Sequence, residues 1–196
     1  MLEKQGRERK FVFRQEDGFI DTGSQWMFGM LLELGDRVFD QVEHLPKPIL
    51  DAIPQDSYLG AARIIYHLVE TDLRIFKLIV DTFPDAAYFP EPPYLDEVSK
   101  RTSIDLATME TAAIDSLGIL KAHLAFRRRH IVSQCTSPGF LDEPINHMSF
   151  ANKRDVLGHL IWHWSYHSGH IGAVTLELGY EYHWTSCRIA GRYRDS

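Results

Sequence analysis

The chain has 196 residues, of which 44% are hydrophobic and 24% charged, and its formal net charge is −6. These values are ordinary for one globular domain. The negative charge excludes a general nucleic-acid binder, which would carry a basic surface. No apolar run approaches the ~18–20 residues of a membrane-spanning helix, and the charged N-terminal stretch is unlike a secretory signal. We therefore expect a cytoplasmic protein that contacts neither nucleic acid nor membrane.

The two cysteines, Cys135 and Cys187, are too few for a disulfide framework or for a cysteine-rich zinc site. We interpret both as free thiols. Any metal ion must therefore be held by histidine and carboxylate side chains.

Apolar residues recur at helical spacing in four long segments. We predict helices over residues 24–43, 57–82, 102–130 and 153–179. The first ends at Pro46, and Asp56 or Ser57 caps the second. Asn152 caps the fourth, and Gly179 is a natural stop. Nothing predicts a sheet, although the run Lys-Phe-Val-Phe-Arg at residues 10–14 alternates weakly like a short strand.

These helices predict an all-α fold, an antiparallel four-helix bundle in which cofactor sites form between facing helices. We assign residues 1–22 to an N-terminal extension, residues 23–180 to the bundle and residues 181–196 to a C-terminal tail. The basic run Arg127 to His130 falls in the predicted last turn of the third helix. There it complements the helix dipole, an interpretation that we prefer to a phosphate-binding patch.

Four histidines lie along one stripe of the fourth helix, at spacings of four, four and three residues: His159, His163, His167 and His170. Two imidazoles one turn apart form half of a metal site. Apolar residues such as Val156 and Leu160 share this side of the helix, so the rings are expected to be buried. Buried ring nitrogens without partners would cost about 1–3 kcal/mol each, so a metal, a carboxylate or water should satisfy them.

The other side of the same helix carries small residues, with Trp162 and Leu176 beside them: Gly158, Ser165, Gly169 and Gly172. Small residues let another backbone approach closely. This face packs either within the bundle or against a second subunit, so a homodimer is one expectation.

A histidine pair needs at least one further ligand, and only two other histidines lie well inside predicted helices. His67 falls at the edge of the apolar arc of the second helix, beside Arg63, Glu70 and Arg74. This position suits a ligand at the mouth of a cleft and suits a solvated residue equally well. We interpret His123 as an ordinary surface or packing histidine.

The stretch that begins at Arg154, Arg-Asp-Val-Leu-Gly-His-Leu-Ile-Trp-His-Trp-Ser-Tyr-His-Ser-Gly-His-Ile, resembles the fourth-helix signature of the DinB-like (YfiT-like) metal-binding bundles. That signature is a His-x-x-x-His pair followed by x-Gly-Gln-Ile, and a third histidine comes from the second helix before acidic residues. The resemblance implies metal ligands at His163, His167 and His67. His170 replaces the usual glutamine, and His159 is an additional histidine. Each is an alternative ligand, a group that hydrogen-bonds to a ligand, or a polar neighbour of the site.

Three neutral imidazoles suit Zn²⁺, Ni²⁺, Co²⁺ or Fe²⁺ and leave one coordination position open. Relatives in the resembled family include transferases that use a low-molecular-weight thiol such as bacillithiol or mycothiol. We therefore expect a metal-dependent thiol (S-)transferase that acts on a small electrophile. The alternatives are a metal-dependent hydrolase and a non-catalytic metal-binding stress-response protein.

The catalytic residues are not identified by the sequence. Glu70, three residues after His67, either orients that ring by a hydrogen bond or pairs with a neighbouring arginine. Glu33 and Asp36 on the first helix could reach the interior of the bundle. The following aromatic residues are more typical of packing than of a substrate platform: Tyr66, Tyr166, Trp162 and Trp164.

Overall fold

The structure is a computed structural model that describes residues 3–5, 21–55, 57, 59–80 and 115–182. This part of the chain is mostly helical. The long helices are α1 (Thr22–Val42), α3 (Ala61–Phe76), α5 (Ser116–Phe126) and α7 (Lys153–Glu177). Shorter helical segments are α2 (Lys47–Asp51), α6 (Val132–Gln134) and a 3₁₀ turn at Phe140–Asp142. None of the helices described is long and apolar enough to cross a membrane.

The boundaries of α7 agree with the sequence prediction. The Asn152 side chain accepts a hydrogen bond from the Asp155 backbone N–H at 3.0 Å, which caps the first turn. Gly179 has a φ of 91°, the left-handed conformation that ends helices and favours glycine. α1 begins slightly earlier than expected because Asp21 caps it through the Ser24 N–H at 2.7 Å.

α3 is shorter than predicted, since it begins at Ala61 rather than near Ser57 and ends at Phe76. Gly60 is the N-cap residue of α3 and has an extended backbone conformation. A Cβ atom at Gly60 would lie 2.4 Å from the Ala52 carbonyl oxygen, so the chain that follows α2 packs directly on this residue. The helix therefore starts only after Gly60.

The prediction that a third helix ends near His130 is wrong. A π-helical turn over Arg127–Ile131 follows α5 and continues into α6, so the helical segment extends to Gln134. The predicted start near residue 102 lies outside the described residues. Arg127 is only 1% exposed, so it does not act as a solvated charge at a helix end.

Within the described residues, four short strands accompany the helices, although the sequence predicted no sheet. β1 (Glu3–Gln5) pairs in parallel with β4 (Tyr180–Tyr182), and β2 (Pro144–His147) pairs antiparallel with β3 (Phe150–Asn152). The β2–β3 hairpin leads directly into the N-cap of α7. The weakly alternating run at residues 10–14 lies outside the described residues.

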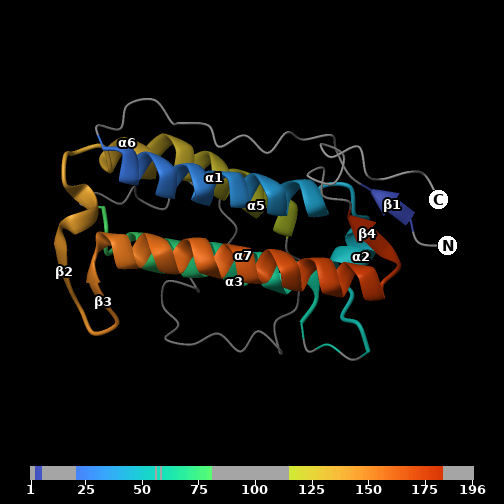
Figure 1. The fold of residues 1–196 in the computed structure, drawn as a ribbon. Coiled ribbons are helices and arrows are strands. Elements are labelled where there is room, and N and C mark those ends of the chain that lie inside the picture. The colour runs from blue at the N-terminus through green and yellow to red at the C-terminus, as the bar shows by residue number, and fades with distance from the viewer. Residues whose placement is uncertain (1–2, 6–20, 56, 58, 81–114, 183–196) are drawn as a thin grey trace, which may run out of the picture.

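α1 packs against α5 and α7, and α3 packs against the same two helices (Figure 1). α1 and α7 run in the same direction, because Met27 lies near Gly158 and, further along both helices, Gln41 bonds to Ser168. This neighbouring pair is parallel, unlike the antiparallel pairs that we expected. The core between the helices contains buried residues from all four: Phe28, Val38, Leu68, Leu120 and Leu160.

Candidate metal centre

α3 and α7 bring His67, His163 and His167 together. The two α7 histidines are one turn apart on the buried side of that helix, where they are 6% and 8% exposed. His67 reaches them from the facing helix and is half-buried. The apolar residues of α7 that share this side, Leu160 and Ile171, are fully buried and fix the face that the imidazoles occupy.

The three rings are close enough to hold a metal ion. The Nε2 atoms of His67 and His163 are 3.0 Å apart, and the ligand atoms of all three histidines lie within 4.8 Å of one another. The ring centroids are 4.6–4.9 Å apart, and the rings meet edge to face. Tetrahedral Zn–N bonds of about 2.0–2.1 Å place neighbouring nitrogens roughly 3.3 Å apart. The His67–His163 separation is therefore close to what a shared cation requires.

All three histidines are held in the neutral form that metal binding needs. Burial lowers the pKa of His163 to about 4, and the nearby imidazole of His67 adds to the shift. Burial and the imidazoles of His163 and His67 lower the pKa of His167 to about 3. Burial also lowers the pKa of His67, although the Glu70 carboxylate opposes this shift. At neutral pH the rings therefore present lone pairs rather than protons to a cation.

The Nδ1 atoms of His163 and His167 are buried and have no hydrogen-bond partner among the described residues. In native structures, most buried polar atoms are paired, and exceptions usually mark a bound ion, a water or a functional site. The Nδ1 atom of His123, a buried histidine of α5 outside the cluster, is unpaired in the same way, so the candidate site rests on the convergence of the three rings and not on these nitrogens.

His159 and His170 flank the three-histidine cluster and are not part of it. The His159 ring stacks on His163 with centroids 5.8 Å apart, and the His170 ring stacks on His167 at 5.9 Å. Both side chains are half-buried. The histidine stripe predicted from the sequence therefore contains two rings that converge on His67 and two that lie beside them.

The carboxylates that we considered as assisting groups are engaged in ion pairs. Glu70 pairs with Arg74, one of the two arginines anticipated, and it is mostly buried. Glu33 binds Arg37 at 2.8 Å on the same helix. Asp36 on α1 binds Arg128, which lies in the π-helical turn after α5, at 2.5 Å. None of these three is a member of the histidine cluster.

A buried polar network lies beside the histidines and was not anticipated. Asp72 on α3 is fully buried and accepts hydrogen bonds from Trp164 Nε1 and His123 Nε2, both at 2.8 Å. The Nε atom of Arg127 lies 3.1 Å from the same carboxylate, and its guanidinium covers the Trp164 ring at 4.2 Å. Of the two roles that we considered for His123, the structure shows the buried one.

The charges in this network follow from its contacts. Burial favours a raised pKa for Asp72, but Arg127 and the hydrogen bonds from His123 and Trp164 outweigh it and lower that pKa. Burial lowers the pKa of His123 in spite of Asp72. The network therefore pairs an anionic Asp72 with a cationic Arg127 beside a neutral His123. A signal was present in the sequence, because Asp72 follows Ile65 by two turns on the apolar stripe of α3.

The small-residue face of α7 is divided between two environments. A Cβ atom at Gly172 would lie 3.6 Å from Gln41 Nε2, and one at Gly158 would lie 4.0 Å from Met27. These two glycines thus face α1 within the chain. Ser165 and Gly169 are exposed. A second subunit on this face stays a prediction.

No protein-family model matches this chain, and no curated protein matches it.

Proposed function

We propose that the protein binds one divalent metal ion, Zn²⁺, Ni²⁺ or Fe²⁺, through His67, His163 and His167 and is a thiol (S-)transferase for a small electrophile. The observation that carries this proposal is the convergence of three neutral imidazoles from α3 and α7. Three protein ligands leave one coordination position open, which is typical of catalytic rather than structural metal sites.

A divalent ion in this position would supply one effect, a lowered pKa for a bound low-molecular-weight thiol, which makes the thiolate available at neutral pH. The protein residues hold the ion and keep the imidazoles unprotonated. The resemblance of α7 to the DinB-like signature supports the same activity and a DinB-like four-helix bundle. The contacts of α1 and α3 with both α5 and α7 agree with that architecture.

The engaged carboxylates favour thiol transfer over hydrolysis. A hydrolase usually has a general base that takes a proton from the attacking water. Glu70 is the carboxylate next to His67 on its helix face, and it pairs with Arg74. Asp72 is fully buried and accepts from two donors while it faces Arg127. A thiol with a lowered pKa is already a nucleophile and needs no such base.

Elemental analysis of the purified chain and of single variants tests the metal centre. We expect about one divalent ion per chain in the wild type and its loss in His163→Ala and His167→Ala, because two imidazoles hold a cation far less tightly than three. His147→Ala is the matched control, since His147 is an exposed histidine of β2 outside the cluster. Full occupancy in His163→Ala would contradict the assignment.

Thiol consumption against a panel of electrophiles, with and without a chelator, then tests the activity. Turnover that requires both the metal and an added thiol is the expected result. Turnover with water alone would identify a hydrolase. Tight metal retention without any turnover would identify a metal-binding protein without catalysis.

A further inference from the structure

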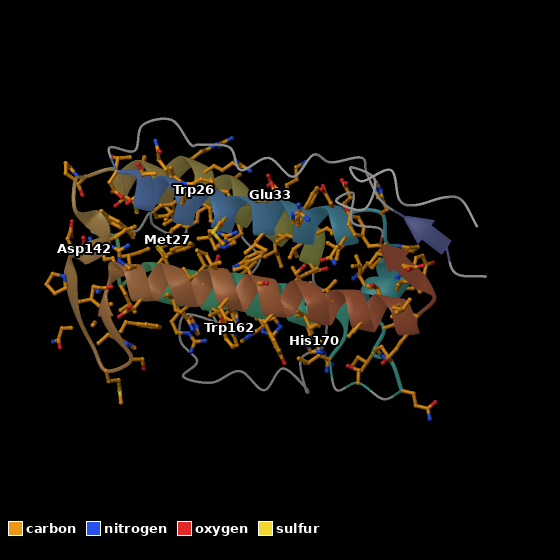
Figure 2. All side chains as sticks on the ribbon, in the orientation of Figure 1. Trp26, Met27, Glu33, Asp142, Trp162 and His170 are labelled. Carbon is orange, nitrogen blue, oxygen red and sulfur yellow. The ribbon has the colours of Figure 1, made fainter. Side chains whose placement is uncertain are left out.

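Trp162 and Tyr166 form an exposed aromatic pair on α7. They are 59% and 56% exposed, and their rings stack with centroids 5.7 Å apart and an interplanar angle of 19°. Figure 2 shows Trp162 and His170 on the side of α7 that faces away from α1. Two large aromatic rings thus stack on each other at the surface, where burial of their apolar area contributes little to stability.

This pair contacts the metal centre directly. The Tyr166 ring meets the His167 ring edge to face, with centroids 5.0 Å apart. Trp162 lies 5.8 Å from the His159 ring, which itself stacks on His163. Each exposed ring is therefore linked, directly or through one imidazole, to a histidine of the cluster.

A structural role for these rings is not supported by their surroundings. Trp164, on the same helix, shows what a structural tryptophan looks like in this protein: it is fully buried and its indole N–H binds Asp72. Beside the pair, a Cβ atom at Gly169 would meet none of the described residues within 4 Å. The described part of the chain therefore leaves space for a flat molecule next to Tyr166.

We propose that Trp162 and Tyr166 are the substrate platform of the metal centre. The ligand is a small molecule with a planar aromatic or conjugated group that stacks on this pair. A second group on the same molecule, within bonding reach of the cation, occupies the open position. This inference rests on the proposed function and adds the chemical class of the ligand. Aromatic surfaces of this kind select by shape and π contact rather than by charge.

Two hydroxamates test the platform in the metal-loaded full-length chain. Benzohydroxamate and acetohydroxamate carry the same metal-binding group and differ in a phenyl ring against a methyl group. Calorimetry measures both dissociation constants in wild type, in Trp162→Ala and in Tyr166→Ala. We expect each variant to weaken benzohydroxamate about tenfold and acetohydroxamate less than about twofold, because only the aromatic probe loses a stacking partner.

Trp26→Ala is the matched control, since Trp26 is an exposed tryptophan of α1 and is 47% exposed. It should leave both dissociation constants unchanged. An equal loss for both hydroxamates, or no loss for either, would overturn the platform while the metal assignment stands. A chain that takes up no metal would bind neither probe and would overturn both proposals together.

Sedimentation of the same variants separates the platform from a subunit contact. One result would identify the Trp162–Tyr166 surface as an interface between two copies of the chain. In that case the wild type is a dimer, Trp162→Ala is a monomer, and the ratio of the two hydroxamate affinities is the same in both. That result would also overturn the platform.

Discussion

Among the charged residues that the structure describes, Asp72 should be the most damaging to replace by its uncharged analogue. Asp72→Asn keeps the shape of the side chain but removes its charge, and Arg127, which is 1% exposed, then loses the carboxylate with which it pairs. The carboxamide also has one acceptor oxygen where the carboxylate offers two, to Trp164 and His123. Removing one partner of a buried ion pair typically costs about 3–5 kcal/mol, and we expect a loss of that size in the free energy of unfolding.

Urea unfolding of the metal-free protein at pH 7, followed by circular dichroism, measures this loss. Arg127→Met should cost less, because Trp164 and His123 still donate to the Asp72 carboxylate. The double variant Asp72→Asn/Arg127→Met buries neither charge. Its loss in the free energy of unfolding should therefore be smaller than the sum of the two single losses, by about 2 kcal/mol or more.

Asp142→Asn is the matched control for this prediction. Asp142 pairs with Arg154 at 2.5 Å, and both side chains are well exposed. Exposed ion pairs contribute about 0–1 kcal/mol, so this variant should unfold almost like the wild type. A loss below about 1 kcal/mol in Asp72→Asn, or strict additivity with Arg127→Met, would refute the idea that the two buried charges stabilise each other.

Two further predictions concern acid and the packing of the guanidinium. The pKa values of His163 and His167 are lowered to about 4 and about 3 from an ordinary 6.5, so below pH 6.5 the unfolded chain binds more protons than the folded one. The metal-free protein should therefore lose stability as the pH falls from about 6.5 towards 4, and the urea midpoint should fall less over this range in His167→Phe. Gly35→Ala should lower the melting temperature despite alanine's better helix propensity, because the new Cβ would lie 2.5 Å from Leu124 and 2.6 Å from Arg127. An unchanged melting temperature would show that these two side chains can move aside and would contradict the prediction.

The sequence was sufficient to predict α7 and the side of it that carries the two clustered histidines. Its histidines share the buried stripe with apolar residues, and its ends carry clear local signals in Asn152 and Gly179. Such signals act within one turn and need no knowledge of the partner helix. The same local reasoning failed for α3, whose start depends on the packing of Ala52 against Gly60.

Contacts between helices were beyond single-sequence reasoning. Periodicity placed His67 at the edge of a face, where a ligand and a solvated residue look alike. Its 3.0 Å approach to His163 is visible only in the structure. Arg127 was interpreted as a dipole partner because it sits in a basic run. The helix does not end there, because a π-helical turn begins at Arg127 and continues into α6. The Arg127 side chain is buried and pairs with Asp72 on α3.

The positions of the two α7 histidines of the cluster, His163 and His167, are fixed by the residues that follow each of them. Trp164, next to His163, donates to Asp72 on α3. Ser168, next to His167, donates to Gln41 on α1 at 3.1 Å, and the Gln41 amide donates back to the Ser168 carbonyl at 3.3 Å. Each turn that carries a histidine of the cluster is thus tied to a different helix by a buried hydrogen bond. Because Asp72 also belongs to the helix that carries His67, its bond to Trp164 constrains the same spacing between α3 and α7 that brings the imidazoles together.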